Sequence, residues 1–229
     1  MTEVKQVHCA VCGAPVRAPF RAPQPEIAPD LDMRPGEPTR STLPDWIETC
    51  GTCHAAAPDL AALPASANAV VRSASYHALG ADASEETLPF LRWAAICRET
   101  GDAPAAAEAT LQAAWAADDA ADTRAAASLR REVARLWGEP ADEETALRLI
   151  DVLRRAGEFA AAEARAEGLA KQDLDETAAR IVAFQRARIA ARDIGRHLIS
   201  SAVPPPAHTP HASLAKRANP RFWERLFKR

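Results

Sequence analysis

Apolar residues recur every three to four positions from about residue 65 onward, which is the spacing of one face of an α-helix. Leu147, Ile150 and Leu153 share one such face. Turns that contain glycine and proline divide this region at Gly101 and at Gly138. The pattern predicts helices over residues 66–79, 85–100, 103–118, 122–137, 141–156, 158–171 and 173–199. Short links between helices of this length are typical of antiparallel hairpins.

The first 60 residues lack this periodicity. Nine prolines fall between Pro15 and Pro58, and they interrupt any helix longer than a turn or two. Short extended pieces are expected near residues 16–20 and 45–48. A segment of this composition buries too little apolar surface to order itself, so we expect a covalent or metal staple.

A weak internal repeat links two parts of the helical region. GDAPAAAEATLQAA begins at Gly101 and GEFAAAEARAEGL begins at Gly157, and both place an alanine (Ala106, Ala162) five residues after the glycine. This pattern resembles the tetratricopeptide repeat, although the offset differs from that repeat's usual period. The predicted fold is mainly α, with a small β ribbon at the N-terminus followed by a tetratricopeptide-like antiparallel helical array. Its expected parts are residues 1–60, 61–200, and a proline-rich linker with a basic tail over 201–229.

Charge is distributed unevenly along the chain. Residues 1–60 carry five basic and eight acidic groups, residues 61–200 carry seventeen and twenty-two, and residues 201–229 carry six and one. An acidic body argues against a nucleic-acid footprint that covers the whole protein. No apolar run is long enough to span a membrane, and the first residues lack the apolar stretch of a secretory signal. These features predict a cytoplasmic protein, in which paired CxxC motifs indicate a metal site before disulfides.

Two CxxC motifs are the strongest chemical signal. Cys9 and Cys12 form one pair, and Cys50 and Cys53 form the other. Each CxxC turn places two thiolates together, and two such turns supply the four soft ligands of a tetrahedral Zn²⁺ site. A closed four-thiolate site leaves no position for chemistry, so the expected Zn²⁺ is structural. The 37 residues between the motifs are expected to form a β-hairpin with a loop.

Other interpretations of these motifs are weaker. The string from Cys50 to His54 matches the c-type haem attachment motif, but covalent haem requires export. A thioredoxin-type redox pair would need a strand before and a helix after it. His8 and His54 flank the motifs and are expected in a supporting or exposed position. Cys97 is expected to be a small buried core residue.

Several charged side chains could also carry function. Asp30, Asp32, Arg34, Glu37 and Arg40 lie in one loop, where we expect exposed ion pairs and turn capping rather than acid–base catalysis.

Arg188, Arg192 and Arg196 recur every four residues and predict a basic stripe on the last long helix. A solvated helix face is the expected role of this stripe, with binding of an acidic partner or of nucleic acid as the alternative.

The last nine residues, RFWERLFKR, form an amphipathic basic tail if they are helical. Phe222, Trp223, Leu226 and Phe227 would then share one apolar face. This face is our candidate partner-binding group, because four large apolar side chains need a surface to cover them. It could pack on the protein's own helices, enter a groove of a protein partner, or contact a membrane peripherally.

The sequences HCAVCGAPV, PDLDMRP, RSTLPDW, TCGTCHAAAPDL and AAWAADDAADTRAA resemble a bacterial family of unknown function. That family combines a two-CxxC zinc ribbon with tetratricopeptide-like helices, and the resemblance covers roughly residues 7–137. It implies metal ligands at Cys9, Cys12, Cys50 and Cys53. The chain departs from the family pattern at His54, where a glycine is expected.

We therefore expect a non-enzymatic, zinc-binding adaptor or scaffold whose partner is a protein. The alternative is a nucleic-acid-binding zinc-ribbon regulator, because Arg17, Arg21, Arg34 and Arg40 lie in the ribbon segment. That segment is net acidic, which disfavours phosphate contacts. An enzyme would require a metal with an open coordination position.

Overall fold

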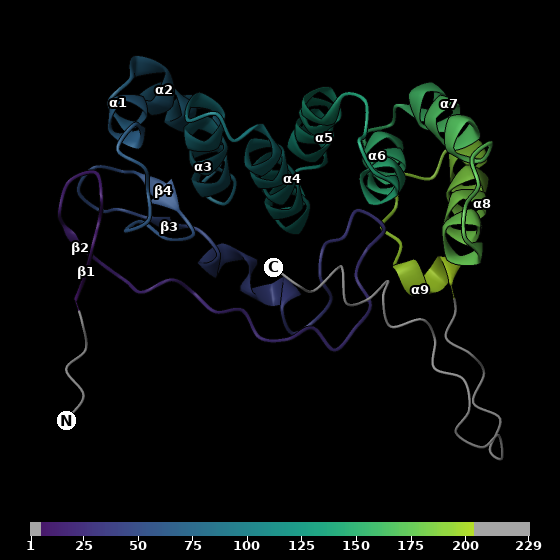
Figure 1. Ribbon diagram of the computed structural model, residues 1–229, viewed down its shortest axis with the longest axis horizontal. Coiled ribbons are helices and arrows are strands. Elements are labelled where there is room, and N and C mark those ends of the chain that lie inside the picture. The colour runs from purple at the N-terminus through teal and green to yellow at the C-terminus, as the bar shows by residue number, and fades with distance from the viewer. Residues whose placement is uncertain (1–5, 204–229) are drawn as a thin grey trace, which may run out of the picture.

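The computed structural model describes residues 6–203 and confirms a mainly helical protein with small N-terminal strands. Its helices stand side by side in one curved row from α1 to α8, and α9 lies beneath α8 (Figure 1). The helices are α1 (Ala67–Val71), α2 (Ala74–Asp82), α3 (Leu88–Glu99), α4 (Ala103–Asp119), α5 (Thr123–Trp137), α6 (Glu143–Arg155), α7 (Phe159–Leu169), α8 (Glu176–Ala190) and α9 (Ile199–Ala202). Among these residues no helix is both long and apolar enough to cross a membrane.

The turns that fold this row follow one local design. After α3, Gly101 adopts a left-handed conformation with φ of 90°, and the N–H of Asp102 donates to the carbonyl of Cys97. The carboxylate of Asp102 then caps α4 by accepting from the N–H of Ala105. A left-handed residue followed by an acidic one recurs after α4, α6 and α8. After α3, α4 and α6 this pattern ends one helix and begins the next with three residues between them, which favours antiparallel neighbours.

Two of the predicted helices are wrong in extent. The helix predicted over 66–79 is divided, because the side chain of Ser73 caps a new helix by accepting from the N–H of Tyr76. The helix predicted over 173–199 ends at Ala190, where Arg192 turns left-handed with φ of 50°. The N–H of Asp193 closes this turn on the carbonyl of Arg188.

The prediction of a basic stripe is therefore wrong. Of its three arginines, only Arg188 lies on α8, and Arg192 and Arg196 follow the end of that helix. Arg188 packs over the ring of Phe184, and Arg192 packs over the ring of Phe159. Arg196 lies 3.9 Å from a carboxylate oxygen of Asp30.

Each CxxC motif lies in its own two-stranded antiparallel hairpin. The first pairs β1 (Val7–His8) with β2 (Pro15–Val16), and the second pairs β3 (Glu48–Thr49) with β4 (Ala56–Ala57). The expectation of one β-hairpin between the motifs is thus wrong. The chain between β2 and β3, residues 17–47, instead leaves the two hairpins. We name these residues the crossing segment.

The crossing segment runs along one edge of the helix row, reaches α6 and returns to the ribbon (Figure 1). Near its far end the N–H of Leu31 donates to the carbonyl of His197, and the N–H of Ile199 donates to the carbonyl of Pro29. Gly36 permits a close approach of the outgoing and returning chains, since a Cβ there would lie 2.3 Å from the carbonyl oxygen of Ile27. On its return the segment forms the short 3₁₀ helix η1 (Arg40–Asp45), and Leu43 packs into the core of α3 and α4.

Of the loop carboxylates expected to be exposed, Asp30 and Asp32 are buried, so the expectation is wrong for these two. Glu37 is exposed and accepts from the N–H of Ser41, as expected of turn capping. Asp30 and Asp32 have no solvent-accessible surface, and Arg34 is 2% exposed. Asp30 does form an ion pair with Arg40, at 3.0 Å, as expected of the loop. Helices α4, α5 and α6 supply partners for Asp32 that the local sequence of the loop does not reveal. Asp30 lies against Arg40 and Arg196 instead.

Asp32 is the centre of these contacts. Its Oδ2 accepts from Trp115 Nε1 and from Arg155 Nη1, each at 3.0 Å, and lies 3.6 Å from Arg130 Nη2. Arg130 and Arg155 also share Asp118, at 2.6 Å each. Burial alone would raise the pKa of Asp32, but the guanidinium groups of Arg155 and Arg130 outweigh it and lower the pKa to about 2.

We predict that Asp32→Asn destabilises the protein by about 3–5 kcal/mol, because it removes one member of a buried ion cluster and leaves the arginines undercompensated. Denaturant unfolding of the purified protein measures the loss. The matched control is Arg180→Ala, which breaks the exposed Arg180–Glu176 pair and should leave stability almost unchanged. Equal effects of the two substitutions would contradict this account.

The pH dependence of stability should report the burial of Asp30. Burial, followed by the charge of Asp32, raises the pKa of Asp30 to about 6. Because the folded state binds this proton more tightly than the unfolded state, Asp30 adds stability as the pH falls through 6. Between pH 8 and pH 5 we expect wild type to gain about 1.4 kcal/mol relative to Asp30→Asn. A difference that stays constant, or that reverses sign, would show that Asp30 is not protonated in this range.

Candidate metal centre

The two CxxC hairpins are local repeats of each other. In the first, the N–H of Cys9 donates to the carbonyl of Ala14, and in the second the N–H of Cys50 donates to the carbonyl of Ala55, both at 2.8 Å. Both turns place the residue after the second cysteine in the left-handed region. Gly13 does so with φ of 74° and His54 with φ of 60°. His54 thus adopts the same left-handed backbone conformation as Gly13, so the two turns have the same local geometry.

The structure brings all four predicted ligand residues together. Their sulfur atoms lie within 4.8 Å of one another. Cys9 Sγ is 3.8 Å from Cys53 Sγ, and Cys12 Sγ is 3.6 Å from Cys50 Sγ. A tetrahedral ion with metal–sulfur bonds of about 2.3 Å holds its sulfurs about 3.8 Å apart. The cluster therefore has the dimensions of a four-thiolate metal site, and all four cysteines are free of disulfides.

The surroundings shift the pKa values of the cysteines in opposite directions. Burial opposes ionisation of Cys50, but hydrogen bonds from the N–H groups of Cys53 and Thr52 outweigh it and lower the pKa of Cys50 to about 7. Burial raises the pKa of Cys9 and of Cys53. A bound cation would remove this difference, because metal coordination deprotonates thiols directly.

The ribbon is fastened to the helix row on one side. Cys9 and Cys50 share an apolar cluster with Leu60, Tyr76 and Ile96. Tyr76 Oη also donates to the carbonyl of His54 at 3.0 Å, which ties the second hairpin to α2. Four thiolates would close the coordination shell, so an ion here would join the two hairpins to each other and to α1–α3.

Three other residues that the sequence singled out, namely His8, His54 and Cys97, lie where the sequence predicted them. His8 and His54 are exposed and lie beside the cysteine cluster, as expected. Cys97 is 1% exposed in the helical core, which confirms it as a core residue, and burial raises its pKa to about 12. Phe222, Trp223, Leu226 and Phe227 lie outside the described residues.

The sequence did not reveal Trp115, Arg130 and Arg155 as partners of the crossing segment. One signal was present: Arg130 lies four residues after Ala126 and three before Val133, both of which are buried on the inner face of α5. An arginine on the apolar face of a helix requires a buried counter-charge. The sequence did not show that Asp32 and Asp118 supply it.

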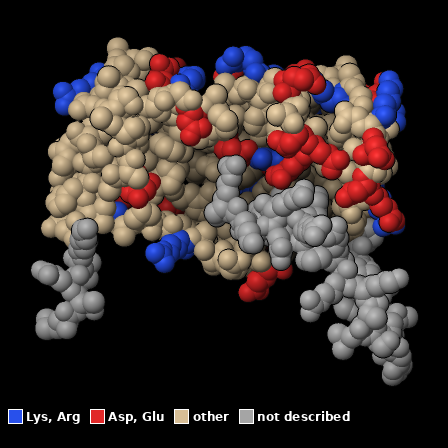
Figure 2. All heavy atoms as spheres, viewed as in Figure 1, with Lys and Arg blue, Asp and Glu red and all other residues tan. Residues whose placement is uncertain are grey.

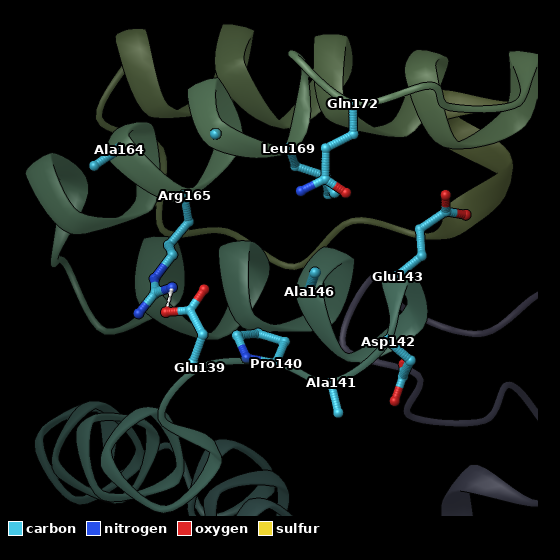
Figure 3. A pocket seen from close by; sticks show the side chains of 11 residues that line it. Glu139, Pro140, Ala141, Asp142, Glu143, Ala146, Ala164, Arg165, Leu169 and Gln172 are labelled. Atoms are coloured by element: carbon cyan, nitrogen blue, oxygen red, sulfur yellow. Dashed lines mark hydrogen bonds and ion pairs between the residues drawn. The ribbon is translucent and has the colours of Figure 1, made fainter.

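A hollow of about 310 Å³ lies between the α5–α6 link, the start of α6 and α7 (Figure 3). The Glu139–Arg165 ion pair lies on one side of it, and Glu143 lies on another. Asp142 caps α6, because its carboxylate accepts a hydrogen bond from the N–H of Thr145. Burial, followed by the charge of Asp175, raises the pKa of Glu143. No sequence-predicted site residue lines this hollow.

The fold and the cysteine cluster define a class: a mainly helical protein with an N-terminal four-cysteine centre that could hold a metal ion. No protein-family model matches the chain, and comparisons with curated proteins and with solved structures give no match. The resemblance to a bacterial ribbon-and-helix family therefore stays a prediction.

We predict one bound metal ion per chain, lost in Cys50→Ser because a hydroxyl is a poor replacement for a thiolate ligand. Elemental analysis of purified protein gives the stoichiometry. Cys97→Ser is the matched control, because it removes a thiol outside the cluster and should keep the metal. Retention of the full metal content by Cys50→Ser would contradict the four-thiolate assignment.

The two left-handed turn positions should respond differently to substitution. Gly13→Ala should destabilise the metal-loaded protein by about 1–2 kcal/mol, through backbone strain alone, because a Cβ there meets no neighbour within 4 Å. His54→Gly should keep the metal and change stability by less than about 1 kcal/mol, since glycine adopts this conformation without strain. Thermal unfolding compares the two. Loss of the metal in His54→Gly would indicate that the imidazole itself takes part in the site.

Proposed function

We propose that this protein is a non-enzymatic scaffold for protein–protein interaction whose four cysteines hold a structural Zn²⁺ ion. The observation that carries the proposal is the closed set of four sulfur ligands, which leaves no coordination position for a substrate. An ion there supplies rigidity, and the exposed surfaces of the helix row supply the binding function.

Zinc is favoured over other metals by the donor set. Four cysteine thiolates in a tetrahedron select Zn²⁺ or iron among the common biological metals. A cytoplasmic location, which keeps thiols reduced, belongs to the same proposal. A colourless protein with one zinc per chain would support it, whereas visible iron–thiolate absorbance would contradict it.

The charge distribution supports a protein partner over nucleic acid. The nucleic-acid-binding alternative rests on four arginines of residues 1–60. Three of them form ion pairs with acidic residues of the chain itself. Arg17 pairs with Glu48 at 3.6 Å, Arg40 pairs with Asp30 at 3.0 Å, and Arg34 pairs with Asp119. On the face drawn in Figure 2, acidic and basic side chains of the described residues are interspersed and form no continuous basic patch.

The test is reconstitution of a complex from purified components. Partners cross-linked to the zinc-loaded full chain are identified, produced separately and mixed with it, and we expect a complex of fixed stoichiometry. In parallel, mobility-shift assays with random single- and double-stranded nucleic acid at low salt should show no binding. Salt-dependent retention of nucleic acid without any reconstituted protein complex would overturn the scaffold proposal in favour of a nucleic-acid-binding ribbon.

A further inference from the structure

The hollow between the α5–α6 link, α6 and α7 has an apolar wall and an acidic rim. Ala146 and Leu169 lie on its wall, together with small side chains of the link and of α7. Glu139 and Glu143 lie on different sides of its rim (Figure 3). Its volume of about 310 Å³ is enough to hold an aromatic side chain.

The rim carries acidic charge that residues 6–203 do not neutralise. Glu139 forms an ion pair with Arg165, but Glu143 has no hydrogen-bond or ion-pair partner among these residues. Around the hollow, residues 139–176 contain eleven acidic and five basic groups. A hollow with this lining favours an occupant that combines an apolar side chain with basic groups.

Gly168 leaves the α7 side of the hollow open. It lies in the last turn of α7, and a Cβ at this position would meet no atom within 4 Å. An incoming side chain can therefore approach the backbone of α7 at this point. The same feature provides a test, because a larger residue at position 168 would fill the hollow from within.

Residues 204–229, which follow the described part of the chain, have the complementary composition. They contain six basic groups and one acidic group. Arg221 and Arg225 flank the aromatic pair Phe222 and Trp223. We name residues 221–229 the basic tail. Its sequence combines large apolar side chains with positive charge, as the lining of the hollow requires.

The described chain ends close enough to the hollow for the basic tail to reach it. Val203 packs against the apolar cluster of α6, α7 and α8 that also contains Ala146 and Leu169. Because helices are about 10 Å across, a cluster of three helices places the hollow within about 30 Å of Val203. A linker of the length of residues 204–220 can span roughly 20–50 Å.

We propose that the basic tail docks on this hollow within the same chain, with Trp223 in the hollow and a flanking arginine against Glu143. Docking shields the aromatic side chains of the tail from water and neutralises the rim. The short tether gives the tail a high effective concentration, so a modest intrinsic affinity is sufficient. This inference goes beyond the scaffold function proposed above and does not depend on it.

The test is fluorine NMR of the full-length, metal-loaded protein labelled with 5-fluorotryptophan. The chain has five tryptophans, and single substitutions assign their resonances. In wild type, Trp223 should resonate away from the position of a solvent-exposed tryptophan. Gly168→Phe fills the hollow and Glu143→Lys reverses the charge of its rim, so each should move this resonance to the exposed position.

Two matched controls should leave the Trp223 resonance where it is in wild type. Gly168→Ala adds only a Cβ, for which there is space. Glu85→Lys makes the same charge change as Glu143→Lys on the exposed link between α2 and α3, far along the row from the hollow (Figure 1). Circular dichroism checks that each variant is folded, and Glu143→Lys alone decides the matter if Gly168→Phe is not.

A second measurement tests the competition between the tail and a free peptide of residues 219–229, NPRFWERLFKR. In fluorescence polarisation, the labelled peptide should bind full-length Trp223→Ala about tenfold more tightly than wild type, because loss of the aromatic anchor weakens the internal competitor. Glu143→Lys added to Trp223→Ala should remove this gain. Equal binding to wild type and Trp223→Ala would contradict the proposal.

Four NMR outcomes would overturn the proposal. One is an exposed Trp223 in the wild-type protein. Another is a shielded Trp223 that neither Gly168→Phe nor Glu143→Lys changes, which would mean that the tail docks elsewhere. Shielding that appears only at high protein concentration would assign the tail to a second copy. Shielding that appears only with vesicles of phosphatidylcholine and phosphatidylserine would assign it to a membrane surface.

Discussion

The burial of the Asp32 carboxylate is the contact on which the far half of the architecture depends. Helices α4, α5 and α6 each contribute a group to the cluster around it, namely Trp115, Arg130 and Arg155. These helices are otherwise joined mainly to sequence neighbours, as expected of a row of antiparallel hairpins. The crossing segment adds contacts between residues 83 and 123 positions apart. It therefore ties together three helices that are otherwise connected mainly to their sequence neighbours.

The cysteine cluster and the ion cluster act at opposite ends of the same loop. The two CxxC hairpins hold the ends of the crossing segment together, and Asp32 holds its middle against the helices. Closing this loop with a metal would remove only a few kcal/mol of chain entropy, which is a small part of what ordering the whole segment costs. The burial of Leu31, Asp32 and Leu43 against the helices supplies contacts that order the rest. This division explains how a segment rich in proline and poor in apolar residues lies fixed along the helices without forming a regular element.

The sequence predicted the parts of the structure that local chemistry determines. The helices around Gly101 and Gly157 were predicted because left-handed glycine and an acidic cap act within a few residues, and the four cysteines because a CxxC turn is itself local. The prediction failed at Ser73 and Arg192, where a serine cap and a left-handed arginine interrupt periodic patterns that look continuous. It failed again at Asp30 and Asp32, because their burial depends on side chains more than 80 positions away. Nothing in the loop itself distinguishes a buried carboxylate from an exposed one.

The contact between the crossing segment and helices α4, α5 and α6 is made by an ion cluster rather than by apolar side chains. Arg34, Arg130 and Arg155 face Asp32, Asp118 and Asp119, so the cluster carries no net charge. Well-packed apolar side chains of similar volume would be expected to stabilise such a contact at least as well. Ionic contacts instead impose one register, because a shift by one residue would bring Leu31 or Met33 against the arginines and leave their charges unpaired.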